Sequence, residues 1–72
     1  MAKISESEIK TAVSALKKAN AYDQKIALSS QSGLVKFLKR VGEHILAQKI
    51  ADLISAAVDI IIQVIFGALR LA

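Results

Sequence analysis

The segment Gln48–Arg70, QKIADLISAAVDIIIQVIFGALR, decides how this chain folds. Six of its polar side chains recur at steps of three, four or seven residues. An α-helix with about 3.6 residues per turn gathers such positions within a sector of roughly 80°, whereas a strand places them on both faces. We therefore expect a helix throughout, with apolar residues on most of its circumference and one polar stripe formed by Gln48, Asp52, Ser55, Asp59, Gln63 and Arg70.

The helical interpretation extends upstream to Leu34. No proline interrupts this region, and Arg40 and His44 continue the polar spacing at steps of four residues. Glycine weakens a helix, so Gly42 is a candidate break and Gly67 is expected to fray the end. This half of the chain therefore forms either one long helix or two helices with a bend.

The N-terminal part predicts shorter helices. Ser5 and Glu8 have the spacing of a capping box, in which each side chain satisfies a backbone N–H at a helix start. Apolar residues then recur on one helical face, and we expect this first helix over Glu6–Ala21. Asp23 is positioned to cap a short second helix that runs through Leu28.

The run SSQSG at positions 29–33 is the clearest loop-like segment. Such clusters of small and polar residues are typical of turns. Ser30 or Ser32 is available there as the N-cap of the next helix.

Length and composition limit the architecture. The chain has 72 residues, 54% of them apolar, with ten Lys+Arg, six Asp+Glu, a net charge of +4 and no Cys, Pro or Trp. One domain, residues 1–72, is all that this length allows. The lack of cysteine excludes disulfide scaffolds, and the apolar content excludes disorder. We predict a single all-α domain, a compact bundle of three to five helices around the apolar C-terminal helix.

The C-terminal segment carries more apolar surface than a short chain can cover. A helix in a two-layer domain needs an apolar stripe somewhat wider than about 100°, and this one offers roughly three times that width. We expect the surplus mainly on the last helix. On an insertion scale Asp59 and Asp52 cancel most of the aliphatic gain, which favours reversible insertion over a lone transmembrane span. The residues assigned to insertion or to a helical interface are Leu53, Ile54, Val58, Ile61, Ile62, Ile65, Phe66 and Leu69.

No group of residues predicts catalysis, a cofactor or a metal. His44 is the sole imidazole and has no nucleophile or ligand set beside it, so we interpret it as a polar residue on a helix surface. Asp52 and Asp59 lie two helical turns apart, about 10 Å, which is wide for a paired-carboxylate site without a cleft. Their stripe is either a solvated surface or a polar seam inside an oligomer. We predict that the protein is not an enzyme.

Basic residues predominate in the first 40 positions, beginning with Lys3. Specific nucleic-acid recognition favours Arg, and this region has a single Arg, so we do not expect a nucleic-acid partner. An anionic membrane surface fits better, because each nearby lysine contributes roughly 1 kcal/mol. The residues assigned to this contact are Lys10, Lys17, Lys18, Lys36, Lys39 and Arg40.

In type, the chain resembles the leaderless and circular helical bacteriocins. The resemblance rests on the start Met1-Ala2-Lys3, the lysine-rich N-terminal helices and the apolar end Val58–Leu71, and it covers the chain as a profile. The chain departs from that profile in lacking Trp and in having few Gly. Members are small, cationic, cysteine-free helical bundles that permeabilise membranes, so the resemblance implies that activity here.

The sequence thus predicts a cationic, membrane-active, antimicrobial protein that binds and permeabilises anionic membranes. The alternative is a soluble oligomerisation or protein-interaction module that buries the same helix against a partner or a second copy. The start of the chain has no signal-peptide pattern. We therefore expect secretion without a leader for the first function and a cytoplasmic location for the second.

Overall fold

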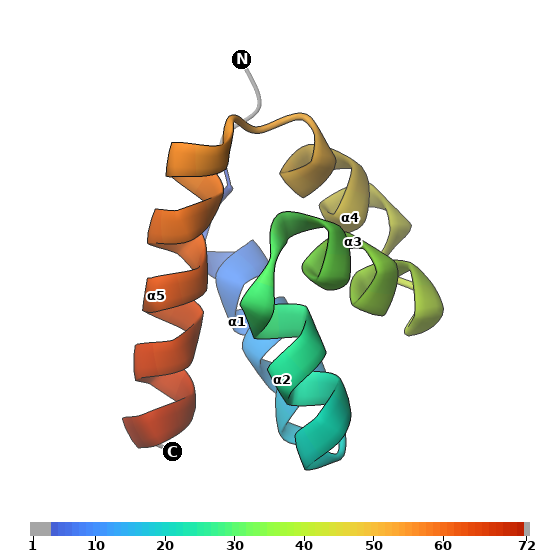
Figure 1. Ribbon diagram of the computed structural model, residues 1–72, viewed down its shortest axis with the longest axis vertical. Coiled ribbons are helices and arrows are strands. Elements are labelled where there is room, and N and C mark those ends of the chain that lie inside the picture. Colours follow the sequence, from blue (N-terminus) through green and yellow to red (C-terminus); the bar gives the residue numbers. More distant parts are fainter. Residues whose placement is uncertain (1–3, 72) are drawn as a thin grey trace.

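The structure is a computed structural model in which residues 4–71 are described, so Met1, Ala2 and Lys3 of the expectations above lie outside the described residues. Within this range the chain forms five α-helices and no strand (Figure 1). The prediction of an all-α bundle of three to five helices is confirmed. The helices are α1 (Glu6–Lys17), α2 (Ala21–Ser29), α3 (Gln31–Arg40), α4 (His44–Ala51) and α5 (Ser55–Leu71).

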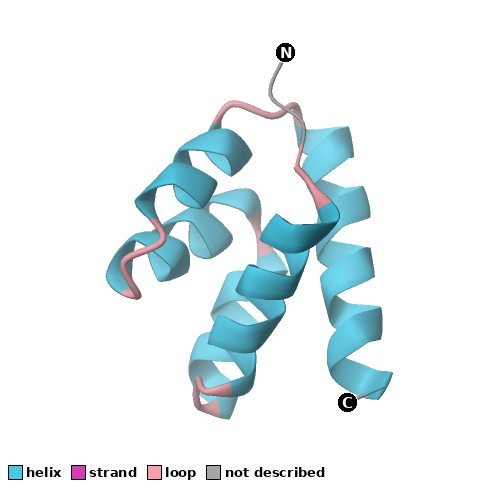
Figure 2. Cartoon of the chain, turned by 180° about the vertical axis from the view of Figure 1, so that it is seen from behind, coloured by secondary structure: helices cyan, strands magenta, loops and turns pink. Residues whose placement is uncertain are grey.

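The helices form an upright group and a crosswise pair. In Figures 1 and 2, α1, α2 and α5 stand upright, and α3 and α4 lie above α2 and to one side of α5. α1 and α5 pack side by side and run in the same direction, whereas α3 packs against α2 and α4 and also touches α5. α5 therefore forms one side of the bundle, with one face on its neighbours and the opposite face in solvent.

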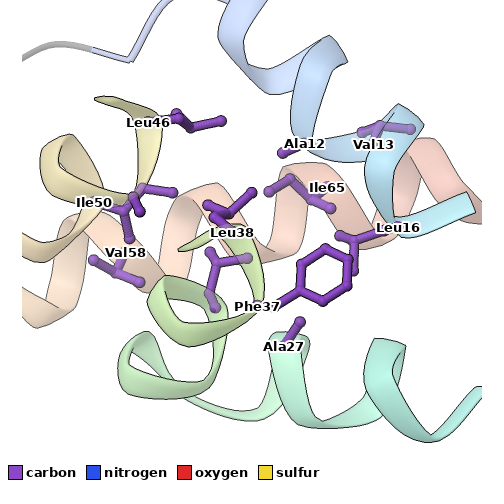
Figure 3. Packing of buried hydrophobic residues seen from close by; sticks show 12 residues of the cluster. Ala12, Val13, Leu16, Ala27, Phe37, Leu38, Leu46, Ile50, Val58 and Ile65 are labelled. Atoms are coloured by element: carbon purple, nitrogen blue, oxygen red, sulfur yellow. The ribbon is translucent and has the colours of Figure 1, made fainter. Parts of the chain in front are cut away.

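Apolar side chains from all five helices meet in one core (Figure 3). Leu34 and Leu38 of α3 are fully buried, and Phe37 beside them is nearly so. Burial of a side chain of this size contributes about 1.5–3 kcal/mol. α3 therefore lies at the centre of the core, and the other helices close around it with Leu16, Ile50, Val58 and Ile65, which are also almost completely buried. The predicted central position of the C-terminal helix is wrong, because α5 packs at one side of the bundle.

Helix α1 begins where the sequence predicts and ends earlier. Ser5 and Glu8 form the capping box, because Ser5 N donates to Glu8 Oε1 at 3.0 Å and Glu8 N donates to Ser5 Oγ at 3.2 Å. The predicted end at Ala21 is wrong, since the helix stops at Lys17. Gln24 explains the early stop: its Nε2 donates to the carbonyl oxygens of Leu16 at 2.7 Å and Ala19 at 3.4 Å, at the end of α1.

Helix α2 is capped by Asn20, and the prediction of Asp23 as its cap is wrong. Asn20 Oδ1 accepts a hydrogen bond from the backbone N–H of Asp23 at 2.8 Å, which places Asp23 inside the first turn. The predicted five-residue loop reduces to Ser30, which caps α3 by accepting from Gly33 N at 3.0 Å. Gly33 is needed here because a Cβ at this position overlaps the carbonyl oxygen of Ile26, so α2 and α3 meet closely.

Gly42 does split the C-terminal half. It has a positive φ of 91°, and the backbone N–H groups of Gly42 and Glu43 donate to the carbonyls of Lys39 at 3.2 Å and Leu38 at 2.8 Å. This pair of bonds is a Schellman motif, which terminates a helix on a glycine in the left-handed conformation. The chain therefore leaves α3 and turns back as α4.

A second break at residues 52–54 was not predicted. It has neither proline nor glycine, and Gln31 holds it from a distance: its Nε2 donates to the carbonyl oxygens of Ile50 at 2.8 Å and Leu53 at 2.9 Å. The expectation of one or two helices after residue 34 is therefore wrong, because there are three. Gly67 lies inside α5, which continues to Leu71, so the expected fraying at Gly67 is also wrong.

Candidate functional site

The six cations assigned to a membrane surface are not gathered on one surface. Lys10 and Lys18 line a hollow of about 430 Å³ beside the α3–α4 turn, and Lys36 and Lys39 line another of about 630 Å³ that shares no residue with the first. Lys17 is exposed at the end of α1. The predicted single docking surface is therefore divided between an α1 group and an α3 group.

The two hollows differ in chemistry. The α1 hollow contains the carboxylate of Glu43 beside Lys10 and Lys18, and Val41 is its exposed aliphatic side chain. The hollow beside α3 pairs Lys36 and Lys39 with residues of the α4–α5 linker and has no acidic residue in its lining. Positive charge and apolar surface therefore coincide more fully on the α3 side.

Lys36 connects that hollow to a neighbouring one between α2 and α3, where Tyr22, Ile26 and Arg40 lie. Arg40 Nη1 forms an ion pair with Asp23 Oδ1 at 3.3 Å, so the acidic group in this hollow has a partner. Tyr22 is 71% exposed, and Ile54 in the linker is 74% exposed. We call this continuous surface the α3 face; it consists of Tyr22, Ile26, Lys36, Lys39, Arg40 and Ile54.

The residues assigned to insertion lie in three environments. Val58 and Ile65 are buried in the core. Leu53, Ile61, Ile62 and Leu69 are half-buried and pack against that core, whereas Ile54 and Phe66 are exposed. Among the described residues, six of the eight exposed large apolar side chains lie beyond residue 40, and the breaks in the C-terminal half divide them between α5, with Ile60, Val64 and Phe66, and the segments before it, with Val41, Ile45 and Ile54.

A groove of about 530 Å³ separates α5 from α2. Leu28 lines it from α2, and Ile62 and Phe66 line it from α5. The guanidinium of Arg70 lies 5.7 Å from the centre of the Phe66 ring, within cation–π distance. α5 is therefore incompletely covered along the edge that faces α2.

The predicted polar stripe is divided by the second break. Gln48 belongs to α4 and donates from Nε2 to Asp52 Oδ1 in the linker at 3.1 Å. The other members lie on α5, all in solvent. Within residues 4–71 no polar or charged side chain is buried, so in the monomer the stripe is a solvated surface. Its members on α5 are Ser55, Asp59, Gln63 and Arg70.

The described residues form neither a catalytic constellation nor a metal site. His44 is exposed in the first turn of α4. In the described part of the chain, no three His, Cys, Asp or Glu side chains are placed to hold a metal ion. The described residues instead form a binding surface, on which lysine ammonium groups lie beside exposed apolar side chains.

Two contacts that hold the helices together have no signal in the sequence. The first is the Gln31 hydrogen-bond pair that fixes the α4–α5 linker. The second joins α4 to α1: Lys49 Nζ lies 2.8 Å from Glu8 Oε2. The Lys49 hydrogen bond, together with the bond from the Ser5 backbone, lowers the pKa of Glu8 from its ordinary value of 4.5 to about 2. Both contacts join residues far apart in the chain.

None of the helices within residues 4–71 combines the length and the hydropathy that a membrane-crossing helix needs. Comparison of the chain with models of known families, with curated proteins and with solved structures finds no match.

Proposed function

We propose that this protein is a small cationic membrane-active protein of the bacteriocin type, which binds anionic membranes and permeabilises them. The observation that carries the proposal is the α3 face, where exposed apolar side chains lie directly beside uncompensated lysines. A surface that combines cations with exposed aliphatic and aromatic groups binds an anionic bilayer by charge and by apolar burial together.

Attraction to the membrane is the first step. The chain carries a net charge of +4, and each lysine near an anionic surface contributes roughly 1 kcal/mol. Lys36 and Lys39 make the contact, and the α1 group of Lys10, Lys17 and Lys18 adds attraction at longer range. Such attraction falls within a Debye length of about 10 Å at 0.1 M salt, so binding weakens as salt rises.

Release of α5 into the acyl region is the second step. The helix contacts α1 and α3 but stands apart from α2 across the groove. Its inner face, with Val58 and Ile65 at the centre, exchanges side-chain contacts for lipid contacts. Because lipid tails are as apolar as leucine, this exchange costs little. The segment Leu53–Leu69 then disrupts the packing of the bilayer.

Leakage from vesicles tests the proposal. Micromolar protein is added to dye-loaded vesicles of phosphatidylglycerol and phosphatidylcholine, with pure phosphatidylcholine vesicles as the matched control. We expect release from the anionic vesicles and much less from the neutral ones. No release from either composition contradicts the function.

One observation favours the second candidate function, a soluble self-association module. On the solvent face of α5, Ile60 and Val64 are 63% and 47% exposed and lie one helical turn apart, so they form an uncovered apolar strip against which a second helix can pack. This module forms a defined dimer or tetramer by light scattering and leaves vesicles intact. A monomer that leaks vesicles excludes it.

Asp59→Leu separates the two candidates with one substitution. Asp59 is exposed on α5, and a carboxylate at the bilayer centre costs about 2.5–3.5 kcal/mol on the insertion scale. If α5 enters lipid, the variant increases leakage. If the face of α5 is a protein interface, the variant changes the oligomeric state measured by light scattering and causes no leakage.

A further inference from the structure

The α3 face has an ordered arrangement of side chains. Lys36 lies in both of its hollows, with Tyr22 and Ile26 on one side and Lys39 and Ile54 on the other. The cations therefore form the middle of the face, and its own two most exposed apolar side chains, Tyr22 at 71% and Ile54 at 74%, mark its ends.

Both ends are held in place by the fold. Gln31 Nε2 binds the carbonyl oxygens of Ile50 and Leu53, which fixes the α4–α5 linker against the first turn of α3. In this linker Leu53 turns toward the core and Ile54 turns to solvent. At the other end, the close approach at Gly33 fixes α2 against α3. The positions of the exposed side chains relative to Lys36 are therefore set by packed backbone.

The charge of the face argues for an anionic partner. Lys36 and Lys39 form no ion pair among the described residues, where the ion pairs are Arg40–Asp23 and Lys49–Glu8. Asp52, in the same linker as Ile54, accepts its hydrogen bond from Gln48. A second copy of this face is disfavoured, because lysines would then oppose lysines across the contact.

The size of the face argues for a lipid surface over a protein. A stable protein interface uses about 20–30 residues on each side, whereas the two hollows of the α3 face are lined by 15 different residues together. A bilayer needs no shaped partner surface. Tyrosine is enriched at membrane–water interfaces, where its ring is buried and its hydroxyl stays hydrated.

We propose that the α3 face is the site that docks on anionic lipid headgroups, an inference that rests on the proposed function. Lys36 and Lys39 contact the phosphates, and Tyr22 and Ile54 enter the boundary between headgroups and acyl chains. Because α5 begins directly after Ile54, this orientation places the first turn of α5 next to the bilayer. The α1 group of lysines lies outside the α3 face.

The sole tyrosine provides an unlabelled probe, because the chain has one Tyr and no Trp. Quenching of Tyr22 fluorescence by acrylamide is measured with and without vesicles of equal parts phosphatidylglycerol and phosphatidylcholine. We expect vesicles to protect Tyr22. The control is the double variant Tyr22→Phe/Ile45→Tyr, which moves the probe to α4, where Ile45 is 75% exposed. There we expect vesicles to leave the quenching unchanged.

Matched charge and apolar variants test the same face by co-sedimentation with these vesicles. Lys36→Gln/Lys39→Gln should weaken binding by about fivefold per lysine. Lys10→Gln/Lys18→Gln removes the same charge and should weaken it less, because these lysines act at longer range. Ile54→Ser should weaken binding roughly tenfold, and Ile45→Ser, at matched exposure, should have little effect. Of the substituted residues, only Lys36 and Lys39 lie on α3, the helix at the centre of the core. Circular dichroism checks that each variant folds.

The outcomes separate this proposal from the function on which it rests. If wild-type protein neither binds nor leaks the anionic vesicles, the proposed function fails and the docking site fails with it. If wild-type protein leaks them but Tyr22 stays fully quenchable, or each variant equals its control, the α3 face is the wrong site and the function stands. If Tyr22 becomes protected without vesicles as a dimer forms by light scattering, the occupant is a second copy.

Discussion

The helices of the front half, α1 to α3, start on side-chain caps, and those of the back half, α4 and α5, do not. Ser5, Asn20 and Ser30 each accept a backbone N–H at the start of a front helix. In contrast, α4 follows Glu43 without a side-chain cap hydrogen bond, and α5 follows Ile54, whose side chain has no acceptor. The front helices are thus defined by their own residues, and the back helices depend on the rest of the bundle.

Gln31 shows how this dependence works. It belongs to the front half, and its Nε2 donates to the carbonyl of Ile50 in the last turn of α4, which also accepts the backbone N–H of Leu53, and to the carbonyl of Leu53 in the linker. A segment with strong helical periodicity is therefore broken by a residue about twenty positions upstream. The same bonds display Ile54 on the surface, so the docking site proposed here depends on how one half holds the other.

Removal of a core side chain should have the largest effect, because it acts on both halves. Leu38 is fully buried at the centre of α3. Leu38→Ala should cost about 2–5 kcal/mol through lost burial and a cavity, which approaches the whole stability of a domain of this size. Urea unfolding followed by circular dichroism measures this cost. A loss below about 1 kcal/mol would mean that α3 does not centre the core.

Gln31→Ala should have the next largest effect and should act on the back half. It removes the side-chain donor of the Leu53 carbonyl, at about 1–3 kcal/mol for a buried group left unsatisfied, whereas the Ile50 carbonyl keeps the backbone N–H of Leu53. We expect faster amide hydrogen exchange at the start of α5. The matched control is Gln24→Ala, which removes a similar pair of bonds at the end of α1. Equal exchange at the start of α5 in both variants would contradict the dependence of the back half on Gln31.

Two glycines offer a smaller test with opposite signs. Gly42 has a φ of 91° with open space where a Cβ would lie, so Gly42→Ala should destabilise by about 1–2 kcal/mol through backbone strain alone. Gly67 lies inside α5 with equal open space, and Gly67→Ala should stabilise by up to about 1 kcal/mol. Thermal unfolding measures both. The same sign for both variants would show that position 42 does not terminate α3 through its backbone conformation.

The fold could be predicted where the determinants are local. The capping box at Ser5, the cap at Ser30 and the all-α class follow from neighbouring residues and from periodicity. The break at residues 52–54 could not be predicted, because Gln31 is distant in sequence and the local residues favour a continuous helix. The early end of α1 was missed for a similar reason, although the residues responsible are nearer in sequence. Asn20 caps α2 and Gln24 binds carbonyl groups at the end of α1, and both compete with continuation of the helix.

The candidate site could likewise be predicted only in part. The sequence selects Lys36, Lys39 and Ile54 by type, and the structure shows that they share a surface. The sequence alone does not reveal that Lys10 and Lys18 line another hollow, because the break at residues 52–54, which was not predicted, decides on which side of the bundle each helix lies. Tyr22 and Ile26 received no role for the same reason. Residue type is local information, and adjacency across helices is tertiary.

The ion pair between Glu8 and Lys49 gives the smallest expected effect and joins the two halves directly. The pKa of Glu8 is lowered to about 2, below its ordinary value of 4.5. A carboxyl whose pKa is lowered in the folded state contributes stability that is fully present above 4.5 and is lost as pH falls through about 2. Glu8→Gln keeps a capping-box acceptor toward Ser5 and removes only the charge. We expect its melting temperature to be below that of wild type at pH 7 and to converge with it near pH 2, with Lys49→Gln as the matching change on α4. A constant difference from pH 7 to pH 2 would place the effect in the cap, within the front half, and would remove the electrostatic connection between the halves.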